Sequence, residues 1–245
     1  MEINFISNQN YFMGLISKVK KKKWVLRSIF STIYFNFHYL PFRQAIKLPI
    51  FLYKPHFRKL KGTISIMGGV KTGMIELGRY QVALYPNSGL IYSNSGGHII
   101  FLGKCCIGNN SAIAIGKNGK VVIGDGFYAS TSFKLAVQYH VTFDSHVMFG
   151  WDCLVMDSDY HKLTKVNGGF TKGYGEILIG ANTWCGNGVL VLKNSIIPSN
   201  CVVGAKSVVS NRLEIPPYSL VCGTPAKLVK QGVWRDPLND IIKYD

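Results

Sequence analysis

The sequence predicts an all-β solenoid, in which short strands wind in successive coils around one core. From Ile179 onward it divides into six-residue units that read IGANTW, CGNGVL, VLKNSI, IPSNCV, VGAKSV and VSNRLE, and a fixed short period is typical of solenoids. Its 26 glycines and 13% aromatic residues favour many short strands separated by tight turns. With 47% hydrophobic and 16% charged residues, the chain does not have the composition of a disordered protein.

Each unit contains two slots that we expect to face inward. The first slot is apolar and fills the core; it holds Ile179, Cys185, Val191, Ile197, Val203 and Val209. The second slot, four positions later, takes a small or β-branched side chain beside a corner; it holds Thr183, Val189, Ser195, Cys201 and Ser207. Such a unit corresponds to one short strand and one corner, and successive coils then stack as parallel strands about 4.8 Å apart.

The period continues upstream but is interrupted once. The first slot recurs at Phe143, Phe149 and Val155, and a looser version covers Ile107 to Ile123. Between Val155 and Ile179 the in-phase residues are His161, Asn167 and Gly173, none of which is apolar. Residues 157–176 are therefore predicted to leave the coil as a polar loop, and loops on a rigid scaffold often carry function.

These repeats, together with IPPYSLVCGTPAKLVK from Ile215 to Lys230, resemble the hexapeptide-repeat acyltransferases. The MDSDYH loop and the VWRD tail at residues 233–236 look most like members that O-acetylate bacterial surface polysaccharides. The resemblance implies a left-handed parallel β-helix with three units per coil, although crossovers between parallel strands are usually right-handed. It also implies a homotrimer with its sites between subunits.

Three regions are expected along the chain. Residues 1–62 form a basic, aromatic-rich and partly helical extension with one or two short helices, and the chain enters the β-helix near Gly62. Residues 63–215 form the β-helix, with the catalytic loop at 157–176. Residues 216–245 form a short closing segment.

His161 is the predicted catalytic residue. Acetyl transfer from a coenzyme A thioester to a sugar hydroxyl needs a base for the hydroxyl proton, and a histidine that is largely neutral near pH 7 suits that role. The enzymes that this chain resembles use one such histidine on the extended loop, with direct attack and no acyl-enzyme. His161 in DSDYH matches that place.

Three further residues are candidates for contact with the acceptor. Asp157 and Asp159 would orient the imidazole or bind the acceptor's hydroxyl groups; the alternative is that they only close a turn. Trp184 matches the tryptophan that flanks the acceptor site in the resembled family, and its face would support a sugar ring. Ordinary packing between subunits is the alternative role for Trp184.

The resemblance also implies a coenzyme site. Its predicted residues are Gly186, Asn187, Gly204, Ala205, Lys206, Ser210, Lys227 and Lys230. Corner amides would meet the pantetheine arm or the thioester oxygen, and lysines would meet the phosphates. Lys206 departs from the family pattern, because it replaces a glycine in the usual Gly-Ala-Gly-Ser run.

Other functions fit less of the sequence. N-acetylation of a nucleotide-linked amino sugar could use the same base, and a non-catalytic scaffold or binding module would have no role for His161. A zinc site would need His140, His146 and His161 to converge, yet His140 and His146 are one unit apart and point from different corners. We expect no metal.

Charge and cysteines suggest partners and location. Of the 28 Lys and Arg, 12 lie in residues 1–62, where Glu2 is the only acidic residue. The run KVKKKKW favours contact of residues 1–40 with an anionic membrane over contact with nucleic acid, because the sequence has no nucleic-acid recognition motif. The alternative is that the run is only a solvated stretch of charge.

No segment is apolar over the roughly 20 residues of a transmembrane helix. The six cysteines lack metal-ligand spacing, and they fit reduced thiols in the cytoplasm.

Overall fold

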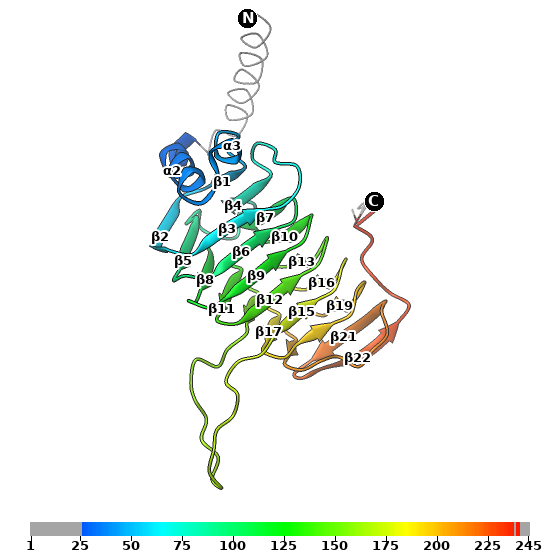
Figure 1. Ribbon diagram of the computed structural model, residues 1–245. Coiled ribbons are helices and arrows are strands. Elements are labelled where there is room, and N and C mark those ends of the chain that lie inside the picture. Colours follow the sequence, from blue (N-terminus) through cyan, green and yellow to red (C-terminus); the bar gives the residue numbers. More distant parts are fainter. Residues whose placement is uncertain (1–25, 238, 241–245) are drawn as a thin grey trace, which may run out of the picture.

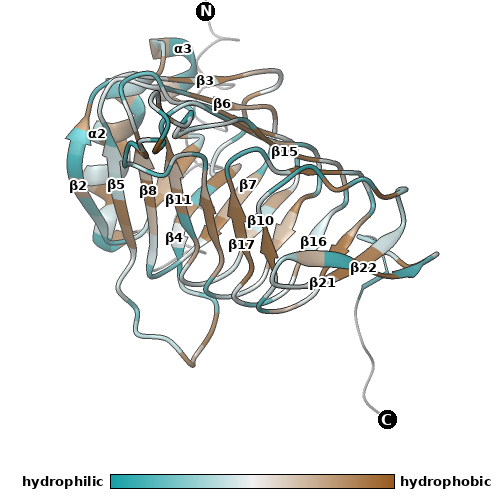
Figure 2. Cartoon of the chain, turned by 90° about the horizontal axis from the view of Figure 1, so that it is seen from below, coloured by the Kyte–Doolittle hydropathy of each residue, from teal (hydrophilic) through white to brown (hydrophobic). Residues whose placement is uncertain are grey.

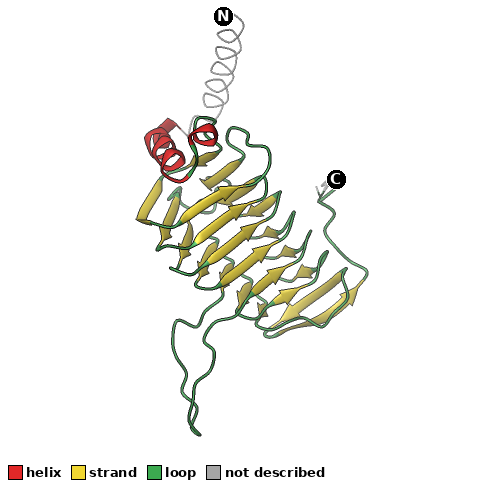
Figure 3. Cartoon of the chain, viewed as in Figure 1, coloured by secondary structure: helices red, strands yellow, loops and turns green. Residues whose placement is uncertain are grey.

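The computed structural model describes residues 26–237, 239 and 240. Its strands form three sheets that wind together as one parallel β-helix, with the described helices gathered at its N-terminal end (Figures 1 and 3). The predicted fold class is confirmed: the coils form a left-handed parallel β-helix of hexapeptide repeats. Of the described helices, none has the length and hydrophobicity needed to cross a bilayer.

Sheet A forms one side of the β-helix and continues into the closing segment. In spatial order its strands are β1 (Ile50–Leu52), β4 (Ile75–Arg79), β7 (Cys105–Gly108), β10 (Phe127–Ala129), β13 (Met148–Phe149), β16 (Trp184–Cys185), β19 (Val202–Val203), β21 (Ser219–Gly223) and β22 (Ala226–Gln231). All neighbours in sheet A are parallel except β21 and β22, which form an antiparallel hairpin.

Sheets B and C complete the triangular cross-section. Sheet B contains β2 (Pro55–Leu60), β5 (Leu90–Asn94), β8 (Ser111–Ile115), β11 (Lys134–Val137), β14 (Leu154–Met156), β17 (Leu190–Leu192) and β20 (Val208–Val209). Sheet C contains β18 (Ile196–Ile197), β15 (Ile177–Ile179), β12 (His140–Phe143), β9 (Lys120–Ile123), β6 (His98–Phe101) and β3 (Thr63–Ile66).

Strand register explains why the six-residue period is sharp downstream and loose upstream. Trp184 pairs with Val202, one coil of 18 residues later. Upstream, Cys106 pairs with Tyr128 across 22 residues, and Tyr128 pairs with Met148 across 20. Corners of variable length therefore blur the period in the first half. Both predicted slots are filled as expected, since every residue assigned to them from 179 to 209 is buried.

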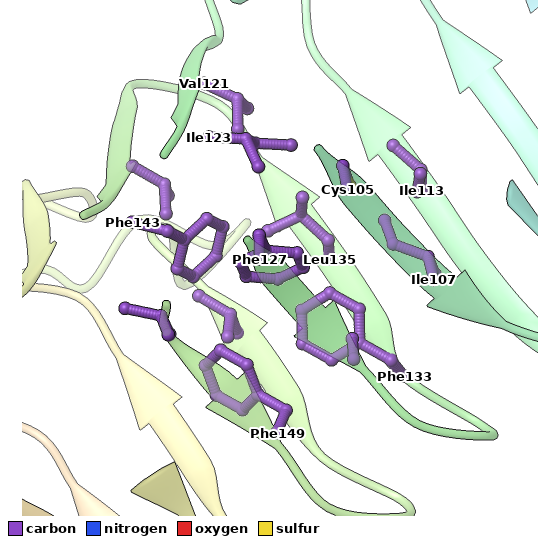
Figure 4. Packing of buried hydrophobic residues seen from close by; sticks show 14 of the residues in the cluster. Cys105, Ile107, Ile113, Val121, Ile123, Phe127, Phe133, Leu135, Phe143 and Phe149 are labelled. Atoms are coloured by element: carbon purple, nitrogen blue, oxygen red, sulfur yellow. The ribbon is translucent and has the colours of Figure 1, made fainter. Parts of the chain in front are cut away.

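Four phenylalanines occupy the middle of the core, at Phe127, Phe133, Phe143 and Phe149, and all four are buried (Figure 4). Phe133 and Phe149 have ring centroids 5.0 Å apart, and Phe127 and Phe143 have centroids 4.8 Å apart. Buried residues alternate with less buried ones along the strands, as in β5 and β8, because successive side chains point to opposite faces. Seen from below, most strands of the β-helix carry hydrophobic colouring, while β2 is largely hydrophilic (Figure 2).

Short helices cover the N-terminal end of the β-helix, namely η1 (Leu26–Ser28), α2 (Ile29–Tyr39) and α3 (Phe42–Ala45). Sheet pairing starts before residue 62, the predicted entry point, because β1 and β2 already pair with β4 and β5. All three residues of β1 are buried. Since helix α2 packs against this strand, β1 lacks the apolar–polar alternation that identifies a strand in sequence.

Polar side chains of the helical segment hydrogen-bond to the main chain at the outer edge of β1 and at Lys54 just after it. The Asn36 side chain donates to Ile50 O (2.7 Å) and accepts from Ile50 N (3.1 Å), while Leu52 N donates to Thr32 Oγ1 (3.2 Å). Lys54 N donates to Ser28 Oγ at 2.9 Å. Ser28, Thr32 and Asn36 are four residues apart and so share one helix face. They satisfy main-chain groups that a further strand would otherwise bind.

We expect Phe149→Ala to lower the free energy of unfolding by about 3–5 kcal/mol, because it leaves a cavity among closely packed rings. Denaturant unfolding measures the loss. Leu84→Ala is the matched control: Leu84 is 75% exposed, so its change should remain within about 0.5 kcal/mol. Equal losses in the two variants would contradict this description of the core.

Candidate active site

The interruption in the repeat is a long loop that leaves the β-helix between β14 and β15 (Figure 1). Met148 pairs with Trp184 across 36 residues, twice the 18 of a regular downstream coil. The loop thus adds the length of one coil, which explains why the phase survives across it. Antiparallel bridges Ser158–Tyr174 and Thr164–Phe170 hold its two arms together.

Asp157 anchors the start of this loop. It is fully buried, and its two carboxylate oxygens accept from Gln138 N (2.7 Å) and Tyr139 N (2.8 Å) of the preceding coil. Burial raises the pKa of Asp157, and the main-chain hydrogen bonds oppose that rise. Of the two roles weighed for Asp157, these contacts favour closing a turn over binding an acceptor.

Asp159 fastens the loop to the following coil. Its carboxylate lies 2.6 Å from Lys193 Nζ, which also donates to Lys172 O at 3.2 Å. One lysine therefore ties together both arms of the loop. Lys193 was not predicted as a site residue, because it lies 34 positions from Asp159 and only the stacking of coils brings them together.

His161 lies in a cleft of about 870 Å³ between the loop and the outer face of the preceding coils. Its side chain is exposed. The cleft is lined by Asn118, Lys120, Gln138, Tyr139, His140, Ser158, Tyr160, His161, Lys162, Thr171, Gly173 and Tyr174. These lining residues include two lysines and no acidic residue, so the cleft is cationic and aromatic.

Aromatic rings form one wall of the cleft. Tyr139 and Tyr174 have ring centroids 5.0 Å apart, and Lys172 Nζ lies 4.8 Å from the Tyr174 centroid. Gln138 Nε2 donates to the Tyr160 hydroxyl at 3.2 Å. Exposed tyrosine faces suit the apolar faces of sugar rings. The sequence analysis missed these tyrosines, which carry no local motif.

His140 has a different environment from His161 although it lines the same cleft. His140 Nδ1 lies 2.9 Å from Glu176 Oε1, and its Nε2 lies 3.4 Å from Thr142 Oγ1. Both of its ring nitrogens thus have partners. Among the described residues, no group of three His, Cys, Asp or Glu side chains is placed to hold a metal ion.

Most of the predicted coenzyme residues lie at a different corner from His161. Gly186 and Asn187 follow β16, and Gly204, Ala205 and Lys206 follow β19, at the corner between sheets A and B. The loop with His161 leaves at the corner between sheets B and C. Ser210 follows β20 at that second corner, while Lys227 and Lys230 lie on β22.

Lys206 shows how this chain accommodates a side chain where the family pattern has glycine. Its φ is 60°, and its amide donates to Asn187 O at 2.8 Å. A Cβ on Gly188 would lie 2.9 Å from Lys206 Nζ. The absence of a side chain at Gly188 therefore leaves room for Lys206 to lie across the neighbouring coil.

Trp184 is on the outer face of sheet A, in register with Met148 and Val202, and is 38% exposed. It is not among the residues that line the His161 cleft. Within one described chain, His161, Trp184 and the coenzyme set are therefore not brought together.

No protein-family model matches the sequence. The chain is 46% identical over 77 residues to "Putative acetyltransferase SAR2635" of Staphylococcus aureus, covering 30% of this chain and 37% of that protein. It is 30% identical over 117 residues to the galactoside O-acetyltransferase of Escherichia coli, covering 46% of this chain and 55% of that enzyme. The chain thus spans about a third to a half of the length of these curated relatives.

Among solved structures, the polysialic-acid-specific acetyltransferase NeuO superposes with a TM-score of 0.58, over 76% of this chain and 74% of that one. At 19% identity, this likeness is one of fold. Together with the sequence relatives, it confirms the resemblance to the hexapeptide-repeat acyltransferases.

We expect Asp157→Asn to destabilise the protein by about 1–3 kcal/mol, because an amide NH₂ would replace one of the two oxygens that accept buried main-chain N–H groups. Thermal or denaturant unfolding measures this effect. Asp159→Asn is the comparison variant: its ion pair is partly exposed, and such pairs contribute at most about 1 kcal/mol. A larger loss for Asp159→Asn than for Asp157→Asn would contradict these assignments.

Proposed function

We propose that this protein is an acetyl-CoA-dependent O-acetyltransferase that modifies a sugar hydroxyl of a bacterial surface polysaccharide or its precursor. The observation that carries the proposal is an exposed histidine, His161, in a cleft between a long loop and a parallel β-helix. The acetyltransferase names of the relatives support the reaction class. Since the donor is a cytoplasmic metabolite, we place the reaction in the cytoplasm.

His161 would act as the general base. Its imidazole would accept the hydroxyl proton of the acceptor while the hydroxyl oxygen attacks the thioester carbonyl. The carbon–sulfur bond then breaks, and the imidazolium returns the proton to the departing thiolate, which leaves as the free thiol of coenzyme A. Atoms and charge balance without an acyl-enzyme.

The cleft wall suggests how an acceptor would be held. Tyr139, Tyr160 and Tyr174 would support sugar rings, and Lys120 and Lys162 would favour a saccharide that carries negative charge over a neutral one. Asp159, through Lys193, would hold the loop in position. Because Trp184 lies outside the His161 cleft of its own chain, it would contact an acceptor only in the cleft of another subunit.

The coenzyme would lie along the corner formed by Gly186, Asn187, Gly204, Ala205 and Lys206. Ser210, at the corner from which the His161 loop leaves, would contact the pantetheine arm from there, and Lys227 and Lys230 would contribute positive charge for the phosphates. Because His161 leaves from another corner, we propose that a complete site needs two copies of the chain, as in the homotrimer that the family resemblance implies.

We expect acetyl-CoA to raise the Tm of both the wild-type protein and His161→Ala. A ligand at about 100 times its Kd adds roughly 2.7 kcal/mol to the free energy of unfolding. With an accepted saccharide, His161→Ala should lower kcat by at least about 100-fold. The control His56→Ala removes an exposed histidine on β2, outside this cleft, and should retain full activity.

If acetyl-CoA raises the Tm of neither protein, a non-catalytic scaffold would be favoured. A shift with transfer only to amino sugars would favour the N-acetyltransferase alternative.

We expect co-expressed His161→Ala and Ala205→Trp chains to recover activity that neither variant has alone. Ala205 is exposed, so the tryptophan should block the coenzyme corner without disturbing the core. In mixed oligomers, a site with His161 from one copy and Ala205 from another would be intact. Native mass spectrometry should verify mixing; mixed oligomers without activity would contradict a shared site.

A further inference from the structure

The N-terminal helices present an apolar surface that the proposed acetyl transfer does not use. We call this surface the end face; it consists of Leu26, Phe30, Ile33, Phe37, Phe42 and Ile46. All six side chains are exposed, with Phe30 at 86% and Phe42 at 68%. Residues 26, 30, 33 and 37 recur at the spacing of one helix face, so they form a continuous stripe rather than scattered contacts.

The orientation of this stripe is fixed by the opposite side of the helix. Thr32 and Asn36 are buried against β1 and hydrogen-bond to its main chain, while Phe35 packs on Tyr92 with ring centroids 5.1 Å apart. Because these contacts hold α2 on the end of the β-helix, the end face cannot turn inward to bury its aromatic side chains.

The Lys and Arg side chains on the described helical segment, residues 26–47, have no acidic counterpart within that segment. Arg27 and Arg43 are exposed beside it, and Lys47 is half-exposed. The sequence contains no acidic residue between Glu2 and Glu76, and Lys18 and Lys20 to Lys23 shortly precede the face. An apolar stripe with aromatic residues and flanking cations is the composition that binds anionic lipid interfaces.

We propose that the end face docks on an anionic lipid surface. Phe30, Phe37 and Phe42 enter the interfacial region, while Arg27, Arg43 and Lys47 contact lipid phosphates. The described helices lie at one end of the β-helix and the catalytic loop extends from the other half (Figure 1), so docking leaves the His161 cleft open to solvent. Such an enzyme would meet its acceptor close to the membrane.

A second copy of this chain fits the end face less well than lipid does. A two-fold contact brings the same surfaces of both copies together. It would therefore place Arg27, Arg43 and Lys47 of one copy against those of the other, with no acidic residue nearby in sequence to neutralise them. Like charges brought together at an interface disfavour association.

The test is co-sedimentation of the full chain with vesicles of phosphatidylcholine alone or with one quarter phosphatidylglycerol. We expect binding to the anionic vesicles only, weakened by added salt. Phe30→Gln/Phe37→Gln/Phe42→Gln should weaken that binding at least ten-fold, and Arg27→Gln/Arg43→Gln should weaken it and reduce its salt dependence. Met67→Gln/Leu84→Gln, which replaces exposed apolar side chains elsewhere, should bind like wild type.

Three results would overturn the proposal. The first is that the wild-type chain binds neither kind of vesicle. The second is that the triple phenylalanine variant binds as tightly as wild type, which would assign binding to the lysine run alone. The third is a smaller oligomeric mass of the triple variant in light scattering, which would make the end face a contact between copies. A retained Tm shift with acetyl-CoA in the triple variant separates this test from that of the enzyme activity.

Discussion

The narrow interior of the coil is the constraint on which the rest of this structure depends. Three sheets share one core, so each inward position has only the space that its neighbours in the adjacent coils leave. Large side chains fit at the strand positions, as Phe143 and Phe149 do, while Ser195 and Ser207 fit beside corners. A close-packed interior transmits any change of volume to its neighbours. The coils thereby form a stiff support from which a polar loop can extend.

The loop is ordered by two contacts that differ in kind. Asp157 binds main-chain groups of the coil before it, while Asp159 reaches Lys193 in the coil after it. Beyond Asp159 the loop does not pack in the core, so residues such as His161 and Tyr174 can face a cleft. A loop that is anchored at its base to a rigid β-helix is a general way to position reactive side chains on a solenoid.

Sequence reasoning predicted the parts of the structure that follow from the period of the chain and missed those that depend on contacts between coils. The slots from Ile179 to Val209 and the loop were predictable because six-residue spacing is local information. Lys193 and the paired rings of Tyr139 and Tyr174 were not, since their partners are 34 or 35 residues away. Strand β1 was also missed, because burial on both faces removes the alternation that marks a strand.

The hydrogen bonds of Thr32 and Asn36 to β1, and of Ser28 to Lys54 just after it, also limit how far this architecture can extend. Stacked coils end in open strand edges, and an open edge is a template for adding further strands. One edge is occupied by helix side chains, and at the other the antiparallel hairpin of β21 and β22 stops the parallel register. The elements at the two ends of sheet A thus oppose the pairing of further strands there, and so oppose end-to-end growth of the solenoid into a filament.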